Sequence, residues 1–232
     1  MRYIQVKQQL DLEISRYHDN QALPSERYLA LKYDCSRETV RKAYEQLRAE
    51  GKIYKNLNVG WFVNQKKIQY DPSSTENFNR YTQQQGFQPK TEILSASKID
   101  HVPPFLEVFD QALQKEGFIE IIRLRYIDNV PVLIEYNYLP HVIFSGLLDY
   151  DYESSVEQIV QQHFNIHYSS SKLTIKNAAP SLLDEKHLLI PSQQSAIRIE
   201  RLSKQHDQIV EFDVEIWRED KIEIVLNIES QL

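Results

Sequence analysis

The chain has 232 residues, enough for two domains that each bury a hydrophobic core. Its formal net charge of −6 excludes nucleic-acid binding unless the basic residues gather in one region. The single cysteine, Cys35, excludes an internal disulfide, and no stretch approaches the roughly 18 apolar residues that a membrane-spanning helix needs. Together with the lack of a signal-peptide pattern, these features predict a soluble protein of the cytoplasm with no membrane partner.

The N-terminal region predicts three helices. Residues 3–17 carry an apolar stripe at helical spacing. Residues 23–51 follow the pattern of two short helices joined by a tight turn, with Ser25 and Ser36 as their N-terminal caps. Gly51 is placed to end the second of these helices.

The second helix of this pair carries basic and polar residues in its first turn. Arg37 and Arg41 are four residues apart and therefore share one face, with Thr39 in the same turn. A recognition helix needs such groups at its N-terminal end because that end enters the major groove of DNA. Short strands at residues 53–55 and 60–63 complete a wing. A generic helical hairpin explains the apolar spacing but not the cap, the cations and the wing together, so we predict DNA binding.

The charge distribution agrees with this interpretation. Residues 1–67 carry 13 Lys and Arg against 8 Asp and Glu, a net charge of +5, which leaves −11 for the remainder. We therefore predict a winged helix-turn-helix domain over residues 1–67, a polar linker over residues 68–76 and a second, acidic domain over residues 77–232.

The second domain alternates predicted strands and helices. Hairpins are expected because alternating apolar segments flank Asp128-Asn129 and the turn at residues 205–208. Successive hairpins predict a mostly antiparallel sheet with helices packed on it, which is an α+β domain. The predicted strands are residues 118–126, 132–138, 173–176, 196–204, 209–217 and 222–228, and the predicted helices are residues 76–85, 155–163 and 181–187.

Several motifs resemble a known family. The segments LPSER (residues 23–27), SRETVRKAYEQLRAEGKIY (36–54) and GWFV (60–63) resemble the winged helix-turn-helix of the GntR superfamily of bacterial transcription regulators. The segments at residues 86–94, 121–140 and 210–221 are similar to the UTRA effector domain of its HutC-type branch, which has a chorismate-lyase-like fold. Residues 100–114 match this pattern poorly and receive no fold prediction.

The resemblance implies a set of DNA contacts at the N-terminal domain. Gly60 would let the wing backbone approach the minor groove closely, and arginine side chains suit guanine edges or phosphates. The implied DNA-binding residues are Arg27, Ser36, Arg37, Thr39, Arg41 and Gly60.

A small-molecule site is predicted in the second domain. Arg123 and Arg125 are two apart on a strand and so point to one face, where they repel each other unless an anion or carboxylate lies between them. Glu135 lies on the paired strand, and Glu211 and Trp217 lie on another hairpin. These residues could form a pocket for an anionic effector with hydroxyl or amine groups. The alternative is a cross-strand salt bridge between Arg125 and Glu135 with no ligand.

The resemblance adds three residues to this site. It implies that Ser155 binds the effector, and it alone suggests Lys90 and Thr91 as anion contacts. The seven histidines show no metal-ligand spacing, so neither a metal nor a cofactor is predicted.

These features predict a cytoplasmic, ligand-responsive repressor that binds an inverted-repeat operator as a homodimer and leaves it when a small anionic effector binds. One alternative is an enzyme that acts on a small carboxylate or phosphate through the lyase-like domain, although no nucleophile and base pair supports it. A third possibility is a regulator whose second domain only dimerises.

Overall fold

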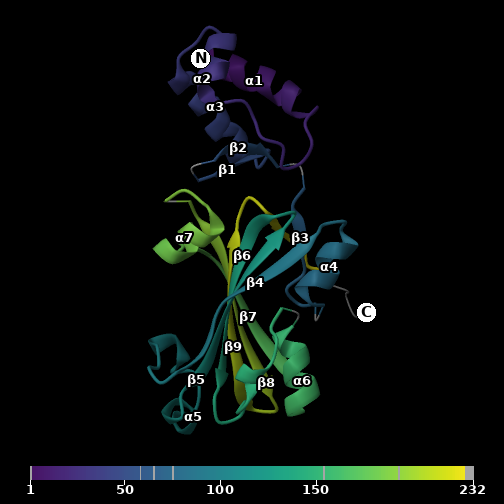
Figure 1. Cartoon of the computed structure of the whole chain (residues 1–232), viewed down its shortest axis with the longest axis vertical. Coiled ribbons are helices and arrows are strands. Elements are labelled where there is room, and N and C mark those ends of the chain that lie inside the picture. Colours follow the sequence, from purple (N-terminus) through teal and green to yellow (C-terminus); the bar gives the residue numbers. More distant parts are fainter. Residues whose placement is uncertain are drawn as a thin grey trace, which may run out of the picture.

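The computed structural model describes residues 2–57, 59–64, 66–74, 76–153, 155–192 and 194–227. These residues form a small helical domain at the N-terminus and a larger domain built on a long sheet (Figure 1). The helices are α1 (Arg2–Ile14), α2 (Glu26–Lys32), α3 (Arg37–Ala49), α4 (Phe78–Gln84), η1 (Pro104–Leu106), α5 (Gln111–Lys115), η2 (Leu147–Asp149), α6 (Val156–Phe164) and α7 (Leu182–Leu188). The strands are β1 (Ile53–Asn56), β2 (Gly60–Val63), β3 (Ile68–Tyr70), β4 (Pro89–Ile99), β5 (Phe118–Ile127), β6 (Val130–Pro140), β7 (Ser170–Ala178), β8 (Ala196–Gln205), β9 (Gln208–Arg218) and β10 (Ile222–Ile224).

The N-terminal domain confirms the predicted caps. The side chain of Ser25 accepts a hydrogen bond from the backbone N–H of Tyr28 at 3.2 Å, and that of Ser36 accepts one from Thr39 at 3.1 Å. Such caps satisfy backbone donors that have no partner within the helix. The apolar stripes of the three helices and the wing then form one core, whose buried members include Leu10, Leu29, Val40, Tyr44, Leu47, Ile53 and Trp61.

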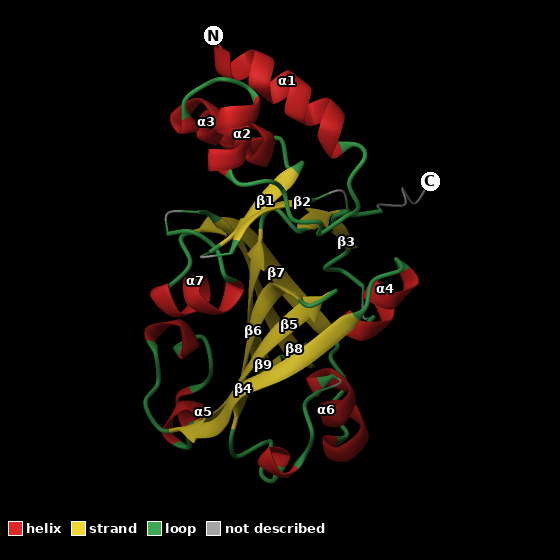
Figure 2. Cartoon of the chain, turned by 45° about the horizontal axis from the view of Figure 1, so that its top comes forward, coloured by secondary structure: helices red, strands yellow, loops and turns green. Residues whose placement is uncertain are grey.

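The larger domain has one antiparallel six-stranded sheet with the order β4-β5-β6-β9-β8-β7. Because successive residues of a strand point to opposite faces, each strand supplies two surfaces. One face carries a hydrophobic core closed by α5 and α7, and the other face is flanked by α4 and α6 (Figure 2). The α+β architecture is therefore confirmed.

Several elements differ from the sequence prediction. Strand β10 ends at Ile224; residues 225–227 are not in a strand, and residue 228 lies outside the described residues. The segment predicted as a linker contains β3, which pairs in parallel with β10. Edge strand β4 was not predicted, because its alternation of polar and half-buried residues gives a weak apolar signal. Residues 100–114, for which no fold was predicted, contain η1 and the start of α5.

A buried polar junction joins the two domains. Asn64 follows β2, and its Nδ2 donates to the carbonyl oxygen of Asp220 at 2.6 Å. Lys221 Nζ donates to Asn64 Oδ1 at 2.8 Å and to Asn20 Oδ1 at 3.0 Å, and it lies 3.8 Å from the centroid of the Tyr54 ring. Lys221 is buried, so these contacts stabilise a charge that has lost most of its water.

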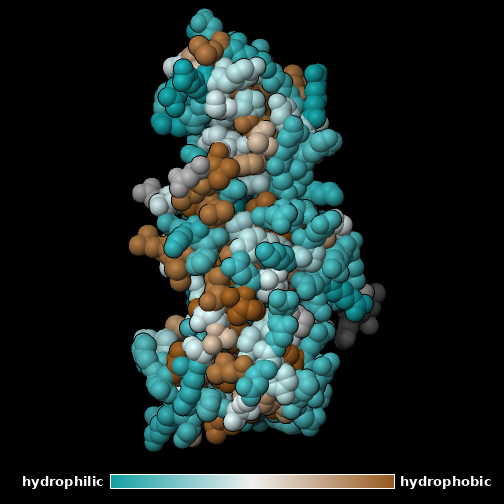
Figure 3. All heavy atoms as spheres, in the orientation of Figure 1, coloured by the Kyte–Doolittle hydropathy of each residue, from teal (hydrophilic) through white to brown (hydrophobic). Residues whose placement is uncertain are grey.

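The wing also contacts the larger domain. The backbone N–H of Leu57 donates to the carbonyl oxygen of Leu189, just after α7, at 3.1 Å. Val59 of the wing and Leu182 and Leu183 of α7 are exposed apolar residues, and Figure 3 shows hydrophobic side chains at the surface where the two domains meet. No helix within the described residues combines the length and the apolar character needed to span a bilayer.

Candidate functional site

The predicted DNA-contacting residues lie along α2, α3 and the wing. Arg27, Arg37 and Arg41 are exposed, and the last two share one face of α3. Arg41 is ion-paired with Glu38, one turn earlier on the same helix. Ser36 and Thr39 are joined through their hydroxyl groups at 2.9 Å. The first turn of α3 is therefore held by its cap while its guanidinium groups stay in water.

Gly60 begins the second strand of the wing with φ +145°, a backbone conformation that L side chains rarely adopt. A Cβ atom built on this residue meets no atom within 4 Å. The glycine is thus required by its backbone angle rather than by crowding, and the open space beside it allows another molecule to approach the backbone.

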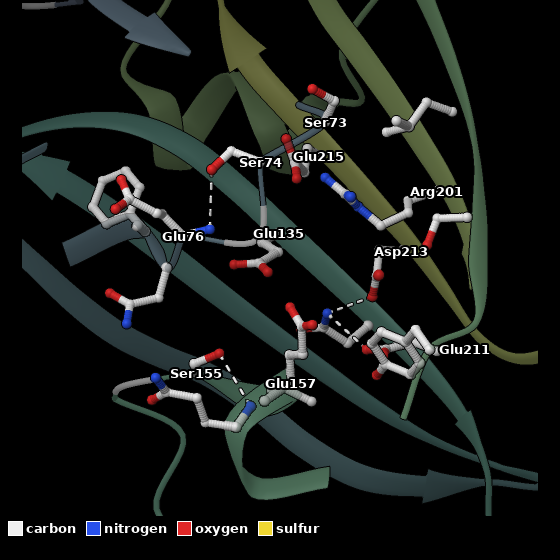
Figure 4. A pocket seen from close by; sticks show the side chains of 18 of the residues that line it. Ser73, Ser74, Glu76, Glu135, Ser155, Glu157, Arg201, Glu211, Asp213 and Glu215 are labelled. Atoms are coloured by element: carbon white, nitrogen blue, oxygen red, sulfur yellow. Dashed lines mark hydrogen bonds between the residues drawn. The ribbon is translucent and has the colours of Figure 1, made fainter. Parts of the chain in front are cut away.

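A pocket of about 630 Å³ lies on the face of the sheet between α4 and α6 (Figure 4). Its floor is formed by β5, β6, β9, β8 and β7, and its walls by α4, α6 and the segment after β3. Among the described residues the lining holds six carboxylates and three guanidinium groups. A volume of this size suits a small metabolite.

Strand β9 shows how the sequence builds this floor. Phe212, Val214 and Ile216 pack into the core on one face, so the intervening residues of β9 face the pocket. These pocket residues are Glu211, Asp213, Glu215 and Trp217. Glu211 and Trp217 were predicted as effector contacts, and the same alternation in the sequence could also have identified Asp213 and Glu215.

The two predicted arginines of β5 share one carboxylate. Arg123 Nη2 lies 2.6 Å from Glu135 Oε1, and Arg125 Nη2 lies 3.0 Å from Glu135 Oε2. Burial alone would raise the pKa of Glu135, but the two guanidinium groups outweigh burial and lower it to about 2. Arg125 Nη1 also donates to Thr91 Oγ1 at 2.6 Å. The structure thus contains the cross-strand salt bridge of the alternative interpretation, placed within a pocket.

A second group of carboxylates is linked to Arg123 through Asn137, whose Oδ1 accepts from Arg123 Nη2 at 3.1 Å. Asn137 Nδ2 donates to Asp213 Oδ1 at 2.5 Å and to Glu211 Oε1 at 3.4 Å, and Tyr168 donates to Glu211. Burial, followed by the nearby charge of Asp213, raises the pKa of Glu211 well above its usual value, and burial raises the pKa of Asp213 to about 6. These side chains are poorly compensated as anions, so a hydroxyl or ammonium group beside them would be stabilised.

Aromatic side chains form one wall. Trp217 Nε1 donates to Glu215 Oε2 at 2.7 Å, and the hydroxyl of Tyr70 donates to Glu215 Oε1 at 3.0 Å. Burial raises the pKa of Glu215 to about 7, although Arg201 opposes this shift. Trp217 packs against Tyr70 and Phe78, with ring centroids 5.2 and 6.3 Å apart. The aromatic wall therefore joins Trp217 of β9, a predicted pocket residue, to the last residue of β3 and the first residue of α4.

The remaining predicted effector contacts differ in position. Ser155 lines the pocket and caps α6, accepting from the backbone N–H of Gln158 at 3.3 Å. Thr91 is not among the described lining residues; it pairs with Arg125 across the strands and contacts the pocket only through the hydrogen bond from Arg125 Nη1. Lys90 does not lie among the described lining residues; its Nζ is 5.4 Å from the centroid of the Tyr126 ring. Adjacent residues of β4 point to opposite faces, so Lys90 and Thr91 cannot both face the pocket.

Sequence analysis missed Arg201 and the connecting segment. Arg201 lies on β8 opposite Asp213 and points into the pocket (Figure 4). Ser73, Ser74 and Tyr81 line the pocket from the segment between β3 and α4 and from α4 itself. The alternation of β8 was available in the sequence, but the contact of the connecting segment with the sheet was not. The described residues contain no cluster of three or more His, Cys, Asp or Glu placed to hold a metal ion.

Comparisons with known proteins match both domains. A family model described as bacterial regulatory proteins, gntR family, matches residues 2–63, and a UTRA domain model matches residues 84–223. A probable fructoselysine utilization operon transcriptional repressor of Shigella flexneri is 26% identical, covering 97% of this chain and 93% of the relative. The transcriptional repressor NagR of Bacillus subtilis is 24% identical, with coverage of 96% and 93%.

A solved structure has the same fold. The crystal structure of PhnF from Mycobacterium smegmatis aligns with a TM-score of 0.65 at 19% identity, and the alignment covers 97% of this chain and 100% of that one. The likeness therefore extends over both domains, from the helix-turn-helix to the six-stranded sheet.

Proposed function

Because the chain belongs to the gntR family of bacterial regulatory proteins and carries a UTRA domain, we propose that it represses transcription until a small anionic effector fills its pocket. Like its relatives, which are named as transcriptional repressors, the protein is a DNA-binding transcription regulator and not an enzyme. The DNA-reading domain lies within residues 1–67 and the effector-binding domain within residues 77–232, with the connecting segment between them.

The observation that carries the effector proposal is the pocket itself. Its lining combines the guanidinium groups of Arg123 and Arg125 with the carboxylate of Glu211. An effector with an anionic group beside the guanidinium groups and hydroxyl or amine groups beside the carboxylates would match this lining. The proposed effector contacts are Thr91, Arg123, Arg125, Glu135, Ser155, Glu211 and Trp217. Lys90 is left out of this set because of its position.

On the DNA side we propose that the first turn of α3 enters the major groove while Gly60 brings the wing to the minor groove. One recognition helix gives a small contact area, so two copies of the chain would bind an inverted repeat as a homodimer in the cytoplasm. The proposed contacts are Arg27, Ser36, Arg37, Thr39, Arg41 and Gly60.

Release of DNA then requires that the effector prefer a conformer whose recognition helices do not match the two half-sites. The effector can shift the equilibrium only by its difference in affinity for the two conformers. Such coupling is typically about 1–3 kcal/mol in allosteric proteins.

The proposal is tested by selecting duplexes from a random library with the full-length protein and then screening metabolites for thermal stabilisation. Anionic metabolites that stabilise the protein should weaken its binding to the selected duplex. An Arg125→Ala variant should bind the duplex normally but respond to the metabolite about 10-fold more weakly, since one charge-assisted contact is worth ~1.5–3 kcal/mol. A tight neutral effector that is indifferent to Arg125→Ala would contradict an anionic effector. The absence of any stabilising metabolite would favour a second domain that only dimerises.

A further inference from the structure

The third guanidinium group of the pocket has different partners from the first two. Arg201 Nη2 donates to the hydroxyl of Tyr70 at 3.2 Å and to the carbonyl oxygen of Pro72 at 3.0 Å. Both acceptors are uncharged in this arrangement. Arg123 and Arg125, in contrast, share the carboxylate of Glu135.

Arg201 also keeps donors available. A guanidinium group has five N–H donors, and among the described residues only Nη2 of Arg201 has hydrogen-bond acceptors. In the part of the chain that the structure describes, Arg201 forms no ion pair. Its side chain is half-buried and lines the pocket between Glu215 and Asp213 (Figure 4). An anion in the pocket could therefore accept from Nε and Nη1, a geometry that suits phosphate or carboxylate.

The acceptors of Arg201 belong to the segment that leads to the DNA-reading domain. Tyr70 is the last residue of β3, and Pro72 follows two residues later. At the other end of β3, the backbone N–H of Ile68 donates to the carbonyl oxygen of Lys221 at 2.8 Å. Lys221 in turn holds Asn64, which directly follows the wing. A continuous set of contacts thus runs from Arg201 to the junction between the domains.

We propose that Arg201 receives an anionic group of the effector and that this contact weakens its hold on Tyr70 and Pro72, so that pocket occupancy changes the position of the DNA-reading domain. A charged acceptor binds a guanidinium group more strongly than a carbonyl or hydroxyl oxygen does. Binding at Nε and Nη1 would draw the guanidinium group toward the anion and Nη2 away from Tyr70 and Pro72, so the connecting segment loses a partner when the pocket fills. This inference rests on the proposed function of the pocket. It adds a residue that both binds the effector and transmits its binding to the connecting segment.

Inorganic phosphate is a suitable probe because it carries the charge without the rest of a metabolite. The test compares wild-type protein with Arg201→Gln at constant ionic strength, and measures thermal stabilisation by millimolar phosphate and affinity for a selected duplex. Arg198→Gln is the matched control: Arg198 lies three residues away on β8, is ion-paired with Glu200 at 2.7 Å, and is absent from the described pocket lining.

Wild-type protein and Arg198→Gln should be stabilised by phosphate and lose DNA affinity in its presence. Arg201→Gln should bind phosphate at least about 10-fold more weakly, as loss of a charge-assisted contact implies, and its DNA affinity should no longer respond. Arg201→Lys keeps the charge without the planar fork and should give an intermediate response, which also serves if Arg201→Gln does not fold. A purely structural role would change stability equally with and without phosphate.

A second variant separates binding from transmission. Tyr70→Phe removes one acceptor of Arg201 but leaves its charge, so phosphate affinity should be retained while the effect of phosphate on DNA affinity decreases. Retained phosphate binding in Arg201→Gln, with loss in Arg125→Gln, would overturn the inference and leave the proposed effector pocket intact. Equal phosphate binding in all variants, or none in wild-type protein, would also overturn the inference, while the metabolite screen would still decide the proposed function.

Discussion

The arginines of α3 and those of the pocket differ in their exposure to water. Arg37 and Arg41 are exposed on a helix, and the ion pair of Arg41 with Glu38 has both side chains about half in water. Arg123 and Arg125 have side chains only 2% and 4% exposed, and their charges are opposed by Glu135. Water screens the charges of the two arginines of α3, whereas protein groups must compensate the charges of the two buried arginines.

This difference suits the two tasks that we propose for arginine in this chain. An exposed arginine can exchange water for a phosphate or a guanine edge at little cost to folding. A buried arginine must be neutralised before any ligand arrives, so its carboxylate partner is part of the fold. Burial, followed by the charge of Arg125, lowers the pKa of Arg123 to about 10, which reflects first the cost of burying a guanidinium group and then its repulsion by a second one.

The largest expected effect comes from removing the buried carboxylate. Glu135→Ala leaves Arg123 and Arg125 without their shared partner and should reduce the free energy of unfolding by about 3–5 kcal/mol. Urea denaturation of the full-length protein measures this loss. The control is Glu38→Ala, which removes an exposed partner of Arg41 and should change stability by less than about 0.5 kcal/mol. Similar losses in both variants would remove the distinction between the two pairs of arginines.

The next effect is on DNA affinity rather than stability. Arg37→Ala should leave the unfolding free energy nearly unchanged but weaken binding to a selected duplex by about 1–3 kcal/mol. The matched control is Arg48→Ala, in the last turn of the same helix, where Arg48 is ion-paired with Glu45 at 2.9 Å. A fluorescence-anisotropy titration in which both variants bind like wild-type protein would exclude Arg37 as a base contact.

The smallest expected effect is on stability and concerns Asp213, a buried carboxylate of the pocket. Because burial raises the pKa of Asp213 from 3.8 to about 6, the folded state binds a proton more tightly than the unfolded state. The stability that comes from the protonated carboxyl is complete below the unfolded pKa and is lost as pH rises through the folded pKa. Asp213→Asn should therefore stabilise the protein by about 1–2 kcal/mol at neutral pH.

The pH dependence provides the control for this variant. The gain from Asp213→Asn should shrink as pH falls through about 6 and disappear below the unfolded pKa of 3.8, where the carboxyl is protonated in both states. Thermal unfolding followed across this range measures the difference. A gain in stability that does not change with pH would mean that ionisation of Asp213 does not destabilise the folded protein.

Local patterns predicted much of this molecule. Caps at Ser25 and Ser36 located the helix-turn-helix, and alternation on β5 and β9 placed Arg123 and Glu211 on the face of the sheet that carries the pocket. These signals depend on neighbours within one element, so a sequence displays them directly.

The missed parts depend on contacts between distant segments. Tyr70 reaches Glu215, 145 residues later in the chain, and β3 finds its partner only in β10. Segment 68–76 is polar and short, and no periodicity indicates that it closes a pocket. Lys90 was predicted from resemblance alone, and the pleat of β4 decides which of two adjacent side chains lies on the same face of the sheet as Arg125.

The parallel pairing of β3 with β10 has a consequence for synthesis of the protein. The core of the DNA-reading domain uses residues from Val6 to Val63, so it can form early on the ribosome. Strand β3 must wait for Ile222–Ile224, and Asn64 must wait for Lys221. A nascent chain can therefore have a folded DNA-reading domain before that domain is attached to the larger domain. Any product released before Lys221 would lack this attachment, and under the proposed mechanism its DNA binding would not respond to the pocket.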